Sequence, residues 1–146
     1  MKNVETTTLP EIAEKMKGID IAILSTHTEN GEIACRPMSN NGDVTYDGSS
    51  YFFTTDDARC VADITRDPKV ALGYSTDPGL FSGGLYVAVE GRAELIRDTA
   101  AFRQHWTPDL DRWFEKGADT PGLVLIKVAA KRITCWEDGE ESEMVI

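Results

Sequence analysis

Residues 85–97 read LYVAVEGRAELIR, and this stretch decides the fold class. It is one long run of residues that favour β-structure, with a glycine near its middle. Gly91 predicts a bulge or a sharp bend, because glycine inside a strand marks a place where the ladder is interrupted or the backbone turns. A long bent strand of this kind is typical of an antiparallel barrel.

Shorter strands are predicted on both sides of this segment, mostly separated by turn sequences. They lie at residues 19–25, 32–39, 51–54, 70–74, 123–128 and 133–136, and the turn sequences are Asn30-Gly31, Asp47-Gly48 and Asp77-Pro78-Gly79. Six or seven strands joined mostly by short turns favour a closed antiparallel barrel, whereas the alternating strand and helix rhythm of a doubly wound sheet is absent. The length of 146 residues predicts one domain, over residues 1–146.

Single helices are predicted between the strands. Thr8 and Gly18 bound the first helix, and Asp98 begins a helix that ends near residue 106, followed by a short one over 108–114. Asp56 and Asp57 are expected to cap a helix that ends at Asp67-Pro68. The apolar face predicted for that helix consists of Ala58, Val61, Ala62 and Thr65.

Charge excludes several classes of partner. The chain has 25 acidic and 15 basic residues, a net charge of −10, which opposes binding to nucleic acid and to anionic membranes. No apolar run is long enough to span a bilayer, and no signal peptide is seen at the N-terminus. The last residues, 139–146, are expected to be a flexible acidic tail.

Cysteine and histidine do not predict a metal site or a catalytic residue. Three cysteines without a CxxC pair, Cys35, Cys60 and Cys135, argue against a disulfide framework and fit a reducing cytoplasm. His27 and His105 have no spacing that suggests a metal. No catalytic triad, GxSxG, HExxH or phosphate loop occurs.

Two arginines beside strand ends are candidates for binding a phosphate. Arg36 lies within the predicted strand 32–39, and Arg59 lies in the first turn of the helix that follows the aromatic strand and its threonines. A helix N-terminus with hydroxyl groups and an arginine suits a phosphate. The alternative is that Arg59 pairs with Asp56 or Asp63 on a solvated helix and that Arg36 is an ordinary surface arginine.

Five groups of residues, taken in order, match a known pattern. They are residues 22–26 (AILST), 36–38 (RPM), 51–55 (YFFTT) with Arg59, 86–93 (YVAVEGRA), and a last group of 113–114, Pro121, 123–126 and 135–138. In this order and spacing the chain resembles the flavin-binding split-barrel proteins related to pyridoxamine 5′-phosphate oxidase. It resembles more closely their bacterial branch, that of general stress protein 26. The resemblance covers about residues 10–138.

The resemblance implies a mainly β (α+β) fold, a six- to seven-stranded antiparallel split β-barrel of Greek-key type with flanking helices. It also implies a homodimer with one FMN in each of two clefts between the subunits. The implied cofactor contacts are Arg36 and Arg59 to the phosphate, Thr54 with Thr55 beside it, the backbone of Pro37, Met38 and Ser39 along the isoalloxazine ring, Tyr86 near the flavin, and Trp136 from the partner subunit.

Simpler interpretations stay open for several of these residues. Trp136 could be a core aromatic, as is expected for Trp106 and Trp113. Tyr86 could pack on a neighbouring strand. Thr54 and Thr55 could be ordinary strand residues.

The chain departs from the oxidase at three places that bear on its activity. Asn41 stands where the oxidase has a lysine that contacts substrate, and Cys60 stands where a lysine follows the phosphate-binding arginine. The oxidase ends on a basic R-L-H-D-R run, but residues 142–146 of this chain read SEMVI. Because an acidic residue there would repel a phosphorylated substrate, we expect no pyridoxamine phosphate oxidase activity.

Three functions remain open at this point. The first is an FMN-dependent oxidoreductase of the flavin reductase type, which would bind NADH or NADPH transiently, since no Rossmann fingerprint exists. The second is a non-enzymatic flavin-binding protein, such as a store, a redox sensor or a stress-response partner. The third is a split barrel for deazaflavin or haem. No haem ligand is obvious, because His27 falls in a predicted turn and His105 on a predicted helix.

Overall fold

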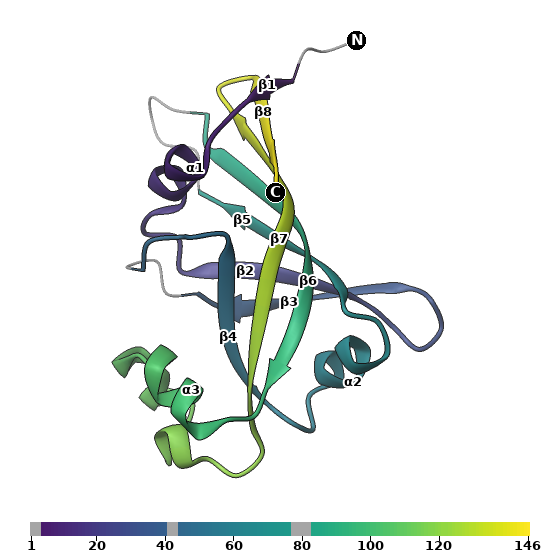
Figure 1. The fold of residues 1–146 in the computed structure, drawn as a ribbon, viewed down its shortest axis with the longest axis vertical. Coiled ribbons are helices and arrows are strands. Elements are labelled where there is room, and N and C mark those ends of the chain that lie inside the picture. The colour runs from purple at the N-terminus through teal and green to yellow at the C-terminus, as the bar shows by residue number, and fades with distance from the viewer. Residues whose placement is uncertain (1–3, 41–43, 77–82) are drawn as a thin grey trace.

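A computed structural model describes residues 4–40, 44–76 and 83–146 (Figure 1). This part of the chain is dominated by strands. The strands are β1 (Glu5–Thr6), β2 (Ile21–His27), β3 (Ile33–Ser39), β4 (Ser49–Thr55), β5 (Lys69–Ser75), β6 (Leu85–Ile96), β7 (Leu123–Glu137) and β8 (Glu140–Val145). The helices are α1 (Leu9–Met16), α2 (Arg59–Arg66) and α3 (Thr99–His105), with the 3-10 turns η1 (Pro108–Arg112) and η2 (Gly117–Asp119).

The strands form one strongly curved sheet, ordered β1-β8-β7-β6-β5-β2-β3, with β4 paired to β7. β7 pairs with β6 along most of its length, with β4 over residues 123–129, and with β8 over residues 132–137. Within the described residues β3 pairs only with β2 and β4 only with β7, so the barrel stays open between β3 and β4. The predicted mainly β split barrel is confirmed, but the expectation of a closed, wholly antiparallel barrel is wrong, since β1 and β8 are parallel.

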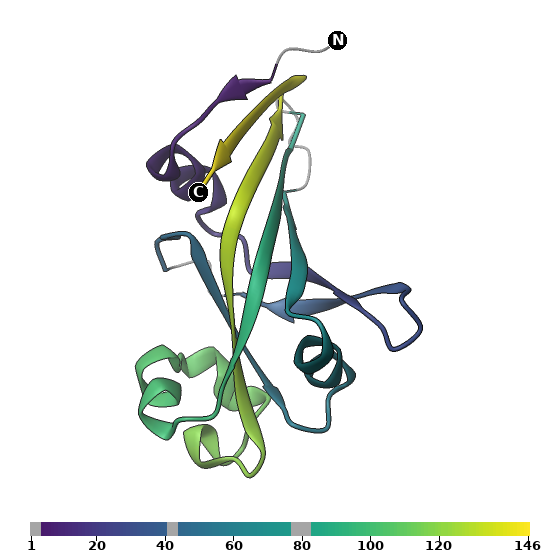
Figure 2. The same cartoon turned by 45° about the vertical axis from the view of Figure 1, so that its right-hand side comes forward.

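The bend predicted at Gly91 is confirmed. The register of β6 against β7 shifts between Glu90 and Gly91, as it does at a bulge. The two strands approach so closely there that a Cβ on residue 91 would lie 2.7 Å from the carbonyl oxygen of Ala129. Only glycine permits this approach, which lets the long β6 and β7 curve across the molecule (Figure 2).

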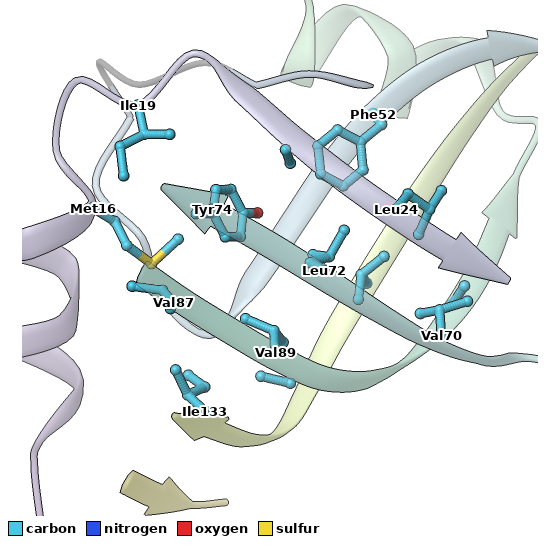
Figure 3. Close-up of a cluster of buried hydrophobic side chains, with 14 of the residues drawn as sticks. Met16, Ile19, Leu24, Phe52, Val70, Leu72, Tyr74, Val87, Val89 and Ile133 are labelled. Atoms are coloured by element: carbon cyan, nitrogen blue, oxygen red, sulfur yellow. The ribbon is translucent and has the colours of Figure 1, made fainter. Parts of the chain in front are cut away.

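The core lies inside this curved sheet. Leu24, Leu72, Val89 and Ile133 come from four different strands and point toward one another, with Phe52 from β4 (Figure 3). Each such side chain contributes about 1.5–3 kcal/mol by leaving water. A second cluster of Phe102, Leu123 and Leu125, with partly buried Phe53, Trp106 and Phe114 against it, packs α3 and the residues on either side of η1 onto the start of β7.

The expected flexible tail is instead strand β8. Asp138 and Gly139 have φ values of 51° and 80°, which is the left-handed pair that a tight two-residue hairpin needs. β8 then pairs with β7 as far as Val145, and β1 covers its outer edge through Glu5 and Thr6. β7 is also continuous from 123 to 137, where two separate strands were predicted.

Helix α2 presents a different face from the predicted one. The helix begins at Arg59, after Ala58, and neither Asp56 nor Asp57 caps it. Its buried residues are Cys60, Val61, Asp63 and Ile64, while Ala62 and Thr65 are exposed. The apolar face was assigned from small and β-branched residues alone, and it missed a buried aspartate that has partners from other elements. The predicted turn Asp77-Pro78-Gly79 and the position Asn41 lie outside the described residues.

Candidate functional site

The opening between β3 and β4 holds a groove of about 660 Å³. Pro37, Met38 and Ser39 from the end of β3 line one wall, and Thr54 and Thr55 from the end of β4 line another. These residues are half-buried or exposed. One cavity is therefore lined by five residues that the sequence marked as cofactor contacts. They come from two segments separated by more than ten positions.

A further wall of the groove comes from η1 and the residues after it. Leu110, Arg112, Trp113 and Phe114 line the groove from this side. Trp113 is 67% exposed, so its expected place in the core is wrong. Charged residues surround it in sequence on both sides, from Asp111 to Lys116, which is the one local feature that could have indicated exposure. The sequence analysis missed this wall.

Trp106 behaves as the core residue that was expected. Its indole packs edge-on against Phe53, with ring centroids 4.9 Å apart, and against Phe114 at 5.8 Å. Its ring N–H donates to Asp111 Oδ1 at 2.9 Å. These contacts fix the segment that carries Trp113 against the outer side of β4.

Arg36 is held firmly beside α2 and is no ordinary surface arginine. Its Nη1 donates to the Thr26 hydroxyl at 2.8 Å and to the Leu24 carbonyl at 3.1 Å. Its Nη2 lies 3.7 Å from Oδ2 of Asp63, which is fully buried on α2. The side chain is itself only 22% exposed, so its charge sits in a partly desolvated position where it interacts more strongly with an anion.

Arg59 is exposed in the first turn of α2, one helical turn before Asp63. The alternative that it pairs with Asp56 or Asp63 is wrong within the described part of the chain. Asp56 pairs with Arg97 at 2.7 Å, and Asp63 is occupied by Arg36 and Arg66. Because Arg59 and Asp63 are four residues apart, they share one side of the helix.

Cys60 lies in the hydrophobic core, although the sequence places it where the oxidase has a lysine beside the phosphate. The residue is 5% exposed and belongs to the main core cluster. Burial raises the pKa of its thiol, and the charge of Arg36 acts in the opposite direction. The helix turns residue 60 inward by about 100° from Arg59, which is why two sequence neighbours face different surroundings.

Tyr86 and Trp136 face away from the core, and the structure does not bring them to the groove of their own chain. They are directly opposite each other on β6 and β7, 48% and 37% exposed. The interpretation of Trp136 as a plain core aromatic is therefore wrong. Ile21 and Ile23 on β2, also strongly exposed, extend this surface, and Ile21 lines the groove as well. We call Ile21, Ile23, Tyr86 and Trp136 the outer apolar patch.

A second cavity of about 280 Å³ lies between α1, the start of β4 and the end of α3. His105 stacks on Tyr51 there, with ring centroids 3.8 Å apart. Burial lowers the pKa of His105, and Lys127 adds to this effect. Burial also raises the pKa of Tyr46, another lining residue. The cavity shares Asn40 with the groove and holds no charged cluster among its described lining residues.

In residues 4–40, 44–76 and 83–146, no group of three or more His, Cys, Asp or Glu side chains is placed to hold a metal ion. None of the helices in these ranges has the length and apolar character needed to cross a membrane.

Comparison with known proteins gives a consistent picture. The sequence pattern described as "Pyridoxamine 5'-phosphate oxidase like" matches residues 7–146. General stress protein 26 of Bacillus subtilis (strain 168) is 27% identical over 135 residues, which cover 88% of this chain and 91% of that protein.

Solved structures share the fold. A Clostridium acetobutylicum protein related to general stress protein 26 superposes with a TM-score of 0.78 at 21% identity, covering 94% of both chains. A general stress FMN/FAD binding protein from Xanthomonas citri superposes with a TM-score of 0.72 at 23% identity, covering 89% of this chain and 88% of that chain. A haem binding protein from Mycobacterium smegmatis gives 0.74 at 16% identity, with 97% of this chain and 60% of that chain covered. At these identities the likeness concerns the fold.

Proposed function

Because the chain belongs to the pyridoxamine 5′-phosphate oxidase-like family, we propose that it binds FMN in the groove between β3 and β4 and acts as an FMN-dependent oxidoreductase. The observation that carries the proposal is the convergence of Pro37–Ser39 and Thr54–Thr55 on one groove, next to strand and helix positions that carry Arg36 and Arg59. The similar fold of the Xanthomonas citri FMN/FAD binding protein supports the choice of cofactor.

The proposed roles of the residues follow from their places. The peptide groups of Pro37, Met38 and Ser39 would lie along the ring system, since β3 has no further strand on that side within the described residues. Arg36 and Arg59 would bind the phosphate with charge-assisted hydrogen bonds. Flavin supplies hydride and electron transfer when it is bound, so the protein needs to bind, orient and desolvate it.

The outer apolar patch supports a homodimer. Ile21 lies both in this patch and in the groove wall, so a second copy placed on the patch would also cover the groove. A two-fold axis would create two equal sites, each completed by Trp136 of the partner subunit. Large aromatic and aliphatic side chains at 37–54% exposure are the composition expected at the centre of such an interface.

The dimer has a direct test. Light scattering of the FMN-loaded protein at micromolar concentration should report twice the mass of one chain, and Ile23→Glu should give one chain mass with weaker FMN binding, because a charge in the patch is desolvated on association. Val4→Glu, at an exposed apolar residue outside the patch, should remain dimeric. A wild-type monomer that still binds FMN tightly would contradict the shared site.

We propose further that pyridoxamine phosphate is not the substrate. Cys60 is buried, so no side chain at that position adds positive charge beside the cofactor phosphate. The C-terminal residues, in which the oxidase carries its basic run, here form β8 with Glu141 and Glu143 opposite Trp136 and Thr134. Negative charge next to Trp136 opposes a phosphorylated amine substrate. Reduced nicotinamide, bound transiently over the flavin, is the proposed electron donor.

Flavin is favoured over haem by the positions of the two histidines. His105 lies in the second cavity, stacked on Tyr51, and His27 ends β2, where its carbonyl accepts from Arg66. Neither belongs to the described lining of the groove. The groove therefore offers no imidazole ligand for an iron among its described residues.

Absorption spectra test the function. Protein reconstituted with FMN and freed of excess ligand should show the bands of oxidised flavin, which NADH or NADPH should bleach without oxygen and air should restore. Ser39→Trp, which fills the groove, should not retain FMN, whereas Glu94→Trp, at an exposed position of β6, should. A haem spectrum without retained flavin would overturn the choice of cofactor. Retained flavin that neither nucleotide bleaches would favour a non-enzymatic flavin protein.

A further inference from the structure

One buried carboxylate in this fold has no place in the proposed chemistry. Asp63 is 0% exposed, and the hydroxyl of Thr26, itself buried on β2, donates to its Oδ2 at 2.8 Å. Arg36 and Arg66 approach the two carboxylate oxygens at 3.7 and 3.5 Å. A well-packed apolar residue would join α2 to the sheet equally well, because desolvating an ion pair offsets much of its attraction. The carboxylate therefore calls for a role besides packing.

The hydrogen bonds run in one direction. An ionised carboxylate can only accept, so the hydroxyl proton of Thr26 points to Asp63. The lone pairs of the same hydroxyl are then turned to Arg36, whose Nη1 donates to it at 2.8 Å. This series of hydrogen bonds, from Arg36 through Thr26 to Asp63, polarises the hydroxyl and strengthens it as an acceptor.

These hydrogen bonds hold Nη1 of the guanidinium in place and leave Nε and Nη2 without a hydrogen-bond acceptor among the described residues. Of the five N–H donors of an arginine, Arg36 uses those of Nη1 on the Leu24 carbonyl and the Thr26 hydroxyl. Nη2 faces Asp63 at 3.7 Å, beyond hydrogen-bond distance, and Nε donates to no acceptor within the described residues. A guanidinium held in this way presents a rigid fork, the geometry that binds phosphate oxygens in pairs.

We propose that Thr26 and Asp63 are positioning residues of the phosphate subsite, which hold Arg36 in the orientation that binds the phosphate of FMN. The inference rests on the proposed function. Asp63 contacts Arg36 and lies one helical turn after Arg59 on α2, so the helix that carries Arg59 also holds the carboxylate beside Arg36. In Figure 1, α2 lies beside the β2–β3 hairpin that carries Thr26 and Arg36.

Thr26→Val tests the proposal, because it removes the hydroxyl and keeps the shape. We expect the affinity for FMN to fall roughly threefold to tenfold, the effect of one lost hydrogen bond, with no change for riboflavin, which lacks the phosphate. Thr26→Ser, which keeps a hydroxyl, should restore most of the FMN preference. In an Arg36→Ala background Thr26→Val should change that preference no further, because both substitutions remove the same oriented guanidinium.

Asp63→Asn supplies a second test at nearly constant volume. It raises the net positive charge around the subsite, so an effect of charge alone would tighten FMN binding. Positioning predicts the reverse, a loss of FMN preference over riboflavin. The amide has no charge to attract Arg36, and it can donate to the Thr26 oxygen as well as accept from it, so the direction of the Thr26 proton is no longer fixed. This variant decides the question even where Thr26→Val unfolds, and a thermal melt of each variant establishes that it is folded.

The results separate the failure of this inference from failure of the proposed function. Suppose that the wild type prefers FMN to riboflavin. The positioning role alone would then be overturned if the variants lost affinity for both ligands equally, or if Asp63→Asn gained preference for FMN. An effect of Thr26→Val that persists in the Arg36→Ala background would also overturn it. A wild type that binds neither flavin would overturn the proposed function and this inference with it.

Discussion

Cys60→Lys is expected to destabilise the protein severely and to weaken flavin binding together with it. Residue 60 is 5% exposed in the main core cluster, on the inward side of α2. An ammonium group there has no buried acidic partner of its own, since Asp63 is already shared by Arg36 and Arg66. Burying an unpaired charge costs on the order of 3–5 kcal/mol, a large part of the free energy of unfolding of a small domain.

Urea denaturation of the apoprotein and an FMN titration together check this expectation. The matched control is Ala62→Lys, because Ala62 lies two residues further along the same helix and is exposed. The control should unfold at nearly the wild-type urea concentration. If Cys60→Lys were instead as stable as the wild type and bound FMN more tightly, the lysine would have to reach the phosphate, and the core placement of residue 60 would be wrong.

Arg59→Ala is expected to lower the affinity for FMN at least tenfold and to leave riboflavin binding unchanged. Only FMN carries the phosphate dianion, and a hydrogen bond to a charged group contributes about 1.5–3 kcal/mol. Arg59 is exposed and has no ion pair within the described residues, so its removal should leave the free energy of unfolding nearly unaffected. The loss should diminish at high salt, which screens exposed charges.

Arg36→Ala should lower the affinity for FMN to the same extent. It should also lower the free energy of unfolding, because Asp63 then keeps only Arg66 and Thr26 as partners. Arg103→Ala, at an exposed arginine of α3 that pairs with Asp119, serves as the control and should bind FMN normally. Equal losses of FMN and riboflavin in the Arg59 variant would show that this arginine supports the fold and does not contact the phosphate.

The position of Cys60 also shows how a family pattern and a structure complement each other. The pattern aligns Cys60 with a lysine beside the phosphate, because it follows Arg59 in sequence. In the helix the two neighbours diverge by about 100°, and the small apolar thiol takes the buried side. A departure from the pattern therefore changes both the charge of the site and the packing of α2.

The sequence by itself determined much of this protein. Alternation and turn residues predicted the strands from β2 to β6, and Gly91 predicted the bend of β6, because these are local properties of the chain. The residues Pro37–Ser39 and Thr54–Thr55, named from a family pattern, do line one groove. Asp138-Gly139 is also a typical sequence for a hairpin turn, although the acidic residues around it suggested a flexible tail.

Only the tertiary structure decided the rest, because it depends on contacts between segments that are distant in the chain. Asp63 is buried beside Thr26, 37 positions earlier, and nothing in the helix pattern marks an aspartate for burial before its partners are known. Trp113 is exposed at the groove, whereas its neighbours Trp106 and Phe114 are partly buried against the cluster of Phe102, Leu123 and Leu125. The barrel stays open because β4 pairs with β7, so that β3 and β4 face a groove and not each other. Local periodicity determines which residues form strands, and long-range packing determines which of those strands meet.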